Sequence, residues 1–273
     1  PAVRNRIVGF ELLTVSQDEE IILRAKAGGN LITGRPTLAK YRDYIKRHNQ
    51  RYKQYDMLFL VTGLDIVEEY GQGVMQYAGF AYIGAVCTDA RVGIGEDIPK
   101  TWFGVRVIAH EVAHLLGCPH DGDSAPGVLG RVPGSTHCPW ADGYLMSYIM
   151  TNRNQFKFSS CCKAMISYLT RMRGRECMTR IDVNTTYNKE ISLPGKYIKA
   201  DKQCKIFFPS LQGTYSIPGK HVEDCRLHCF VPKQYYGYDT FLEQMAFDGT
   251  SCSDDPSKVC YNGFCKDHPK NPR

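Results

Sequence analysis

The sequence of 273 residues predicts a mixed α/β (α+β) fold, a twisted mixed sheet with a histidine-bearing helix, followed by a small disulfide-rich module. Short apolar runs typical of buried strands, and a later stretch with helical apolar spacing, predict the first part. Twelve cysteines, six of them after residue 177, predict the module. Hydrophobic residues make up 43% of the chain, enough for a packed core. We expect two domains, residues 1–177 and 178–273.

Strand-like and helix-like segments alternate in the first third of the chain. Residues 6–15 are rich in Ile, Val, Leu and Phe, and residues 56–63 read DMLFLVTG, so both predict buried strands. A helix is expected from Pro36 on, because proline suits the first turn and apolar side chains then recur at helical spacing. Residues 64–73 are Gly-rich and are expected to form an inserted loop.

The middle of the chain predicts more strands and two helices. Residues 77–97 look like strand material with a turn near Asp89, and residues 101–116 look like a helix. Apolar side chains recur about every 3.6 residues in that helix and form one stripe, at Val105, Ile108, Val112 and Leu116. A long loop rich in Gly and Pro covers residues 121–140, and a further helix is expected around residues 163–173.

Residues 110–121 read HEVAHLLGCPHD, the pattern H-E-x-x-H-x-x-G-x-x-H-D. His110 and His114 are four residues apart, so on a helix they share one face and can bind one metal ion. Gly117 can adopt the positive φ that ends a helix, which lets His120 return as a third ligand. The alternative is a helix with ordinary polar or core histidines, and the extended pattern argues against it.

Three imidazole ligands favour zinc and leave one coordination position open, which is typical of a catalytic site. Glu111 follows the first ligand and is placed beside the ligand face, where it can act as a general base toward a water molecule. We therefore predict one Zn²⁺ ion bound by His110, His114 and His120, with Glu111 as the catalytic residue.

The cysteine count indicates an oxidising, secretory environment. Zinc knuckles are the alternative, but the pairs Cys225/Cys229 and Cys260/Cys265 lack their C-x-x-C spacing. Asn184-Thr185-Thr186 is a glycosylation sequon. No apolar run is long enough to span a membrane, and the chain begins at Pro1 without a signal peptide. We interpret it as a mature or truncated piece of a secreted, extracellular precursor.

The formal net charge is +6, with basic and acidic residues mixed along the chain. A nucleic-acid partner would require a concentrated basic stripe or a motif, and neither is found. One local basic cluster is interpreted as a solvated helix face, at Arg171, Arg173, Arg175 and Arg180. The composition therefore predicts neither a nucleic-acid nor a membrane-spanning role.

With the zinc pattern established, the chain resembles a metzincin metalloprotease, and more narrowly the reprolysin (adamalysin, ADAM-like) family. Asp121 after the third histidine is typical of that family. The segments GFAYIGAVC and RVGIGED, at residues 79–87 and 91–97, are similar to the reprolysin strand pair before the zinc helix. DMLFLVTG at residues 56–63 looks like the preceding strand. The resemblance covers about the first 177 residues and implies the metzincin fold.

Two further segments narrow the resemblance. CPWADGYLMSY, at residues 138–148, looks like the Met-turn of secreted reprolysin-like proteases of arthropods, notably of tick saliva. Residues 193–265 resemble the cysteine-rich region that follows the catalytic domain in ADAMTS-type proteins.

The resemblance implies roles for residues around the zinc ligands. Met146 would form a hydrophobic floor beneath them, with Met150 as the competing candidate. Tyr148 has the M-x-Y spacing of a tyrosine near zinc, so it either donates a hydrogen bond to the developing oxyanion or is a packed core tyrosine. Asp121 would steady the turn by a hydrogen bond within the domain.

The resemblance also implies how a substrate would bind. Gly79, Phe80 and Ala81 match the edge strand that pairs with an extended peptide. Residues 121–148 would form the wall of the pocket for the residue after the cut bond.

Disulfide pairing is partly implied. Cys87 with Cys177 matches a family bridge. Cys138 would pair with Cys161 or Cys162, and Cys118 with the other of these two. A free thiol at Cys118 is the alternative, and the fifteen pairings of the six C-terminal cysteines stay open.

The chain also departs from the family. A strand and a long helix that normally come before residue 6 are missing, so we expect the chain to start inside the catalytic domain. The family's N-terminal calcium ligand is absent with them. Asp56 matches another calcium position, but Arg180 stands where Asn is expected, so a Ca²⁺ ion is a possible but weakly supported cofactor.

The leading hypothesis is a secreted, monomeric zinc endopeptidase acting on extended peptide segments of extracellular or matrix proteins. If the tick-like resemblance holds, host haemostatic proteins such as fibrinogen are the implied substrates. The alternative is an extracellular binding protein that acts mainly through the cysteine-rich module. No Arg-Gly-Asp tripeptide is present to support integrin binding.

Overall fold

The computed structural model describes residue 3 and residues 5–71, 73–130, 132–180, 192–217 and 222–269. The chain divides into two compact units. The first unit comprises residues 1–140 and 158–185, and the second comprises residues 141–157 and 186–273. The segment 141–157 thus belongs to the second unit, and a single domain boundary after residue 177 stays a prediction.

Among the described residues, the first unit contains the α-helices α1–α5 and two three-stranded sheets. Its elements in chain order are α1 Val15–Ile21, β1 Leu31–Thr33, α2 Gly34–Arg47, α3 Asn49–Tyr52, β2 Leu58–Thr62, β3 Asp65–Tyr70, β4 Gly73–Tyr77, β5 Gly79–Ala81, β6 Val92–Glu96, α4 Phe103–Leu115 and α5 Ser160–Leu169. The predicted helices from Pro36, over 101–116 and around 163–173 correspond to α2, α4 and α5, and the predicted strand at 56–63 to β2.

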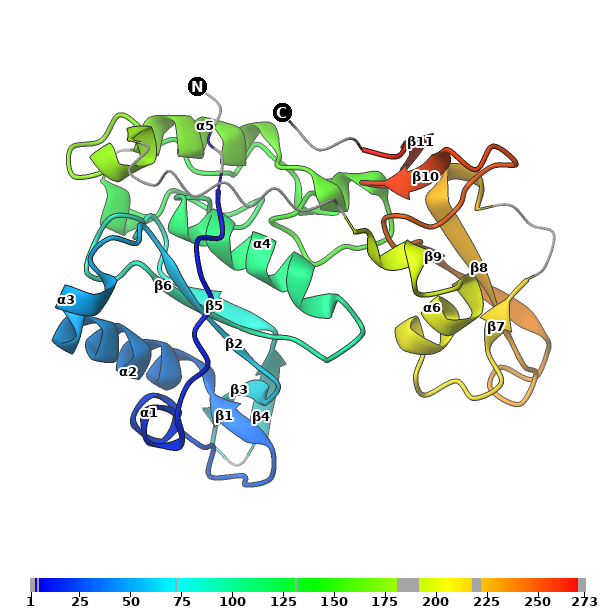
Figure 1. Ribbon diagram of the computed structural model, residues 1–273, viewed down its shortest axis with the longest axis horizontal. Helices are drawn as coiled ribbons and strands as arrows, with labels where there is room; N and C mark the ends of the chain where they lie inside the picture. The colour runs from blue at the N-terminus through cyan, green and yellow to red at the C-terminus, as the bar shows by residue number, and fades with distance from the viewer. Residues whose placement is uncertain are drawn as a thin grey trace. The chain divides into compact units, whose positions relative to one another are not determined.

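A three-stranded sheet of order β2-β6-β5 lies between two helices in this unit (Figure 1). β2 runs parallel to β6, and β5 pairs antiparallel with β6. Leu60 and Ile94 belong to the core that α2 covers, whereas Gly95 meets Val107 of α4 on the other face. A Cβ at Gly95 would lie 2.7 Å from Val107 Cγ1, so the glycine allows α4 to approach the sheet closely.

A second three-stranded sheet has the order β1-β3-β4, with β1 parallel to β3 and β4 antiparallel to β3. β3 and β4 form a hairpin closed by the pair Tyr70 and Gly73. The prediction of an inserted loop over residues 64–73 was therefore wrong. Apolar and polar residues do not alternate regularly in the β3 sequence DIVEEY, so this sequence alone cannot be distinguished from a polar loop. Pairing with β1 and β4 decides its conformation.

The predicted strand over residues 6–15 is also wrong: residues 5–14 form no strand, and α1 begins at Val15. Phe10 and Leu12 are 93% and 94% exposed. An apolar run becomes a strand only where a neighbouring strand completes its hydrogen bonds, and no described residue pairs with this run in a sheet.

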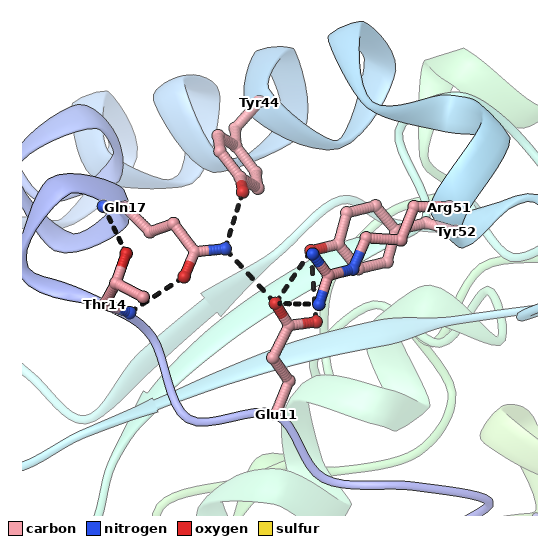
Figure 2. Close-up of polar contacts among 6 residues, drawn as sticks. All are labelled: Glu11, Thr14, Gln17, Tyr44, Arg51 and Tyr52. Carbon is pink, nitrogen blue, oxygen red and sulfur yellow. Dashed lines mark hydrogen bonds and ion pairs between the residues drawn. The ribbon is translucent and has the colours of Figure 1, made fainter.

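Polar contacts hold this extended segment against the helices (Figure 2). Thr14 caps α1: its hydroxyl accepts from Gln17 N, while the Gln17 side chain accepts from Thr14 N. The Glu11 carboxylate accepts from the Tyr52 hydroxyl at 3.1 Å and pairs with Arg51 at 2.9 Å. Gln17 also donates to the Tyr44 hydroxyl, so side chains and not a strand ladder position residues 11–17.

The second unit is smaller and rich in cysteine. Its elements are α6 Ala200–Phe207, β7 Tyr215–Ser216, β8 Arg226–Val231, β9 Thr240–Met245, β10 Lys258–Tyr261 and β11 Phe264–Asp267. β7, β8 and β9 form an antiparallel sheet, and β10 and β11 form a hairpin. Three disulfides cross-link it, Cys204–Cys229, Cys225–Cys260 and Cys252–Cys265. Within the described ranges, none of the helices has both the length and the apolar character needed to cross a bilayer.

Candidate metal centre

Three histidine side chains converge in the first unit. His110 and His114 lie on α4, and Gly117, with φ of 99°, ends the helix and redirects the chain. His120 returns from the turn that follows, so the three ligand atoms lie within 4.8 Å of one another. The Nε2 atoms of His110 and His120 are 3.2 Å apart.

Hydrogen bonds on the far side of two imidazoles set their orientation. His114 Nδ1 lies 2.7 Å from the carbonyl oxygen of Cys118, which accepts only if Nδ1 carries the proton. The Nε2 lone pair of His114 is then available for a metal. His120 Nδ1 lies 3.5 Å from the carboxylate of Asp123, which supports the same arrangement for the third ligand.

Burial keeps these imidazoles neutral. It lowers the pKa of His114 from 6.5 to about 4, and it also lowers the pKa of His120, against the opposing effect of Asp123. A metal ligand must be unprotonated, so both side chains are in the binding form at neutral pH without a metal to displace their protons.

The donor set fits zinc. Zinc–nitrogen bonds of about 2.0–2.1 Å in a tetrahedron place two ligand nitrogens roughly 3.3 Å apart, close to the 3.2 Å found here for His110 and His120. Three nitrogen donors leave the fourth position open. The other two donor clusters within the described residues, His137/Cys138/Cys161 and Cys225/Cys252/Cys260, contain half-cystines, which offer no thiolate. No cluster in the described part includes Asp56, the residue matched to a calcium position.

Glu111 is buried between the ligand helix and β5, with 5% of its surface exposed. Burial raises the pKa of Glu111 from 4.5 to about 8. Its Oε2 atom has no hydrogen-bond partner among the described residues. A Cβ at Gly79 would lie 2.9 Å from Glu111 Oε1, so a glycine is required where β5 passes the carboxylate. A buried carboxylate without a partner is costly unless a bound group completes it.

The first turn of α5 holds the turn that carries His120. Cys118 is disulfide-bonded to Cys162, and the Ser159 hydroxyl donates to the Asp121 carboxylate at 2.6 Å. Ser159 is the N-cap of α5, because its oxygen also accepts from Cys162 N. The turn that carries His120 is therefore held on both sides, by the disulfide bond of Cys118 and by the buried hydrogen bond to Asp121.

The remaining predicted bridges are resolved in the first unit. Cys138 pairs with Cys161, which leaves Cys162 for Cys118, and Cys87 pairs with Cys177. Neither Cys118 nor any other described cysteine is a free thiol.

The other predicted site residues are placed as follows. Gly79, Phe80 and Ala81 are the three residues of β5, which ends the sheet order β2-β6-β5. Met146 is fully buried and Tyr148 is 58% exposed, both in the second unit, so Tyr148 is not a packed core residue. Their roles at the metal stay predictions. Asn184 lies outside the described residues.

Sequence reasoning missed two contributors to this centre, Ser159 and Asp123. Ser159 stands before the Cys-Cys pair at the start of a helical run, which is an N-cap signal, but nothing local indicates that its partner is Asp121. Asp123 lies three residues after His120, a spacing that by itself is common in acidic loops.

Three converging histidines in the pattern H-E-x-x-H-x-x-G-x-x-H, with a buried glutamate beside them, are the metal centre of the metzincin class. Residues 17–159 match the reprolysin model of metallo-peptidase family M12, and the chain belongs to this family. Residues 194–266 match ADAMTS cysteine-rich domain 2, which confirms the resemblance of the second region.

Relatives from several animals are similar to this chain. A disintegrin and metalloproteinase with thrombospondin motifs like protein of Bombyx mori is 28% identical over 97% of this chain and 38% of its own length. The venom metalloproteinase antarease-like TserMP_B of Tityus serrulatus is 32% identical over 63% of this chain and 77% of its own length. A disintegrin and metalloproteinase with thrombospondin motifs 13 of Mus musculus is 25% identical over 94% of this chain and 17% of its own length. The chain thus spans well under half of the first and third of these relatives.

Proposed function

We propose that this protein is a secreted zinc endopeptidase that cleaves extracellular proteins, with Glu111 as the general base. The observation that carries the proposal is the buried Glu111 carboxylate, whose Oε2 atom has no partner among the described residues, beside the converging set of three histidines. Venom and ADAMTS-like relatives and the three disulfides in each unit support secretion.

His110, His114 and His120 would hold the ion, and a bound Zn²⁺ would supply Lewis acidity that lowers the pKa of a water molecule from ~15.7 toward ~7. Glu111 accepts the proton of the attacking water and then delivers it to the leaving amine. Burial raises the pKa of Glu111, and the positive charge of a bound ion would oppose this effect and favour the ionised carboxylate that acts as the base.

The main chain of β5 orients the substrate. β5 lies at the end of its sheet, and within the described ranges it pairs only with β6. Ala78 accepts from Glu96 N at 2.8 Å, so Ala78 and Phe80 turn toward β6 while Gly79 and Ala81 direct their N–H and C=O groups outward. An extended peptide paired with these groups passes beside Glu111, because Gly79 lies against that carboxylate.

Proteolysis with and without a metal chelator tests the proposal. The protein should digest a nonspecific substrate such as denatured casein, lose this activity in the chelator, and recover it on addition of Zn²⁺. Digestion of fibrinogen in the same assay tests the tick-like substrate expectation separately. Activity that is indifferent to chelation, or that persists in Glu111→Ala, would overturn the proposal.

A binding role of the second unit is a further candidate, which the exposure of its aromatic residues favours. Tyr215, Tyr238 and Phe241 are 40%, 66% and 46% exposed, and Tyr215 stacks on Phe230 at 4.9 Å. Exposed aromatic side chains mark binding surfaces more often than ordinary surface. Retention of the Glu111→Ala protein on an immobilised extracellular-matrix protein, lost when Tyr238 and Phe241 are both replaced by Ser, would support this role.

A further inference from the structure

One loop of the second unit starts and finishes close to the third histidine. Residues 141–157 belong to the second unit, although the chain on either side of them belongs to the first. Just before this loop, the Trp140 ring lies edge-on to the His120 ring, with the ring centroids 5.8 Å apart. Two residues after it, Ser159 donates to Asp121, the neighbour of His120 in the chain. Both ends of the 141–157 loop are therefore anchored at the turn that carries the third histidine.

Hydrogen bonds across the loop tie its middle to Trp140. Trp140, Ala141 and Asp142 form one 3-10 helical turn. The Asp142 carbonyl accepts from Asn154 Nδ2 at 2.9 Å and from Asn152 Nδ2 at 3.3 Å. The Asn152 side chain also accepts from Asn154 N at 2.8 Å, which fixes the two asparagines relative to each other. The position of this asparagine pair therefore sets the position of the turn that contains Trp140.

Arg153 lies between these two asparagines and docks on the β10–β11 hairpin of the same unit. Its guanidinium carbon is 4.7 Å from the centroid of the Phe264 ring, and its Nη2 atom pairs with the Asp224 carboxylate. Lys157 Nζ lies 4.7 Å from the centroid of the same ring. The Asp224 side chain is 75% exposed, so the contact of two cations with one ring contributes more than the ion pair.

The hairpin that receives Arg153 is cross-linked and tightly turned. Asn262 and Gly263 have φ of 51° and 75°, the left-handed conformations of a type I′ turn. A Cβ at Gly263 would lie 3.1 Å from Arg153 Cγ, so glycine allows the arginine stem to pack on the turn. Cys260 and Cys265 face each other across the hairpin, and both are disulfide-bonded. The docked arginine thus has a fixed partner.

Trp140 is placed to contact a substrate. In a tetrahedral zinc site, a group at the open position lies roughly 3.3 Å from each ligand nitrogen. A side chain packed on the His120 ring is therefore a near neighbour of a peptide bound there. Trp140 is 36% exposed, so part of its indole is accessible to that peptide. Tryptophan offers a large, flat apolar surface, which makes such contacts strong.

We propose that Arg153 is a positioning residue for substrate binding. Docked on Phe264, it fixes the two asparagine amides that hold the turn of Trp140. Trp140 in turn contacts the substrate residues next to the cut bond. The proposal rests on the proposed endopeptidase function. The zinc ligands are held separately, by the bridge at Cys118 and the hydrogen bond at Asp121, so the expected effect is on substrate affinity and not on zinc content.

Peptide kinetics test the proposal. A fluorogenic peptide copies one site that the protein cuts in denatured casein. Arg153→Ala should raise its KM roughly threefold to tenfold at similar kcat and unchanged zinc content, as expected for the loss of a cation–π contact. Arg153→Lys, which keeps a cation over the ring, should restore most of the affinity. The control Lys266→Ala removes a matched contact in the same hairpin, Lys266 over the Tyr261 ring at 4.6 Å, and should keep the wild-type KM.

A double-mutant cycle tests the route through Trp140. Trp140→Ala should raise KM at least as much as Arg153→Ala does. Adding Arg153→Ala to Trp140→Ala should then have no further effect, because both changes remove the same contact with the substrate. The proposal is overturned by a wild-type KM for Arg153→Ala, by an equal rise in the Trp140→Ala background, or by an equal rise for Lys266→Ala.

Fluorescence tests the position of Trp140 without any catalysis. The chain has two tryptophans, so Trp102→Phe leaves Trp140 as the only emitter. In that background, Arg153→Ala and Phe264→Leu should raise the acrylamide quenching constant roughly twofold, because Trp140 is 36% exposed and a loosened turn exposes it further. Lys266→Ala should leave the constant unchanged.

The two measurements separate the positioning role from the proposed function. Equal quenching constants for Arg153→Ala and its background would overturn the positioning role, whatever the kinetics show. If the wild type cleaves no peptide, the proposed function fails, and quenching still decides whether Arg153 positions Trp140. If Phe264→Leu does not fold, Arg153→Ala still decides, because it changes a side chain that is 32% exposed.

Discussion

The two units use disulfide bonds for different purposes. The main core of the first unit is aliphatic and aromatic, built between α2 and its sheet, and contains no cysteine. Its bridge Cys118–Cys162 instead flanks a zinc ligand. In the hydrophobic cluster described in the second unit, five of the eight buried residues are half-cystines, so the bridges themselves form much of this core. In a small unit with few apolar side chains, covalent bonds replace hydrophobic burial, whereas in the larger unit they can position a turn.

The largest expected effect is on catalysis in the first unit alone. Glu111→Gln keeps the shape of the side chain but removes the base, so kcat should fall by about 10²–10⁴. The zinc content of Glu111→Gln, measured by metal analysis, should equal that of the wild type. The control variant Glu19→Gln on α1 should keep the wild-type kcat. A Glu111→Gln protein with wild-type kcat would show that Glu111 is not the catalytic base.

The next largest effect is the loss of stability or of zinc affinity when one disulfide is removed from either unit. Replacing Cys225 and Cys260 by Ser should cost about 2–5 kcal/mol of stability in the second unit, because its core is made of such bridges. Calorimetry should show the loss, while zinc binding by the three histidines persists. Replacing Cys118 and Cys162 should show the reverse pattern, with weaker zinc binding. If both pairs of substitutions weaken zinc binding equally, the two sets of bridges do not differ in purpose.

Ser159→Ala should weaken zinc binding by roughly tenfold to a hundredfold, because it leaves the buried Asp121 carboxylate without its 2.6 Å hydrogen bond. Competition with a chromogenic chelator measures the affinity. Ser159→Thr should restore most of it, and Ser167→Ala, further along α5, serves as the control. An unchanged affinity for Ser159→Ala would mean that the disulfide alone holds the turn.

The smallest effect concerns pH in the metal-free protein. Burial raises the pKa of Glu111 from 4.5 to about 8, so between these values the folded state keeps a proton that the unfolded chain has lost, and stability falls as pH rises. His114, with its pKa lowered from 6.5 to about 4, acts in the opposite direction below pH 6.5. Between pH 6.5 and 8 the Glu111 effect should stand alone.

The measurement is the difference in Tm between wild type and Glu111→Gln in the presence of chelator. Glu111→Gln should gain stability relative to wild type as pH rises from 6.5 to 8. Zinc should remove most of this difference, because the ion favours the ionised carboxylate. A difference that does not change with pH would argue against the burial of an ionisable group at this position.

The convergence of the histidines and the helix that carries two of them could be predicted from sequence alone, because four-residue spacing on a helix places two histidines on one face whatever surrounds them. The cysteine content likewise predicted disulfides, and the strand at β2 and the helices α2, α4 and α5 follow from local periodicity. Residues 6–15 and 64–73 were predicted wrongly, because strand formation depends on a partner that the local sequence does not specify.

The tertiary structure decided everything that joins distant segments. It chose Cys162 and not Cys161 for Cys118, it brought Ser159 to Asp121, and it paired β4 with β3 and β5 with β6. These outcomes depend on how layers pack and on which strand pairs with which, and such contacts leave no periodic signal in the chain. The sequence by itself determined the set of three histidines, and the packing decided how the turn that carries the third of them is held.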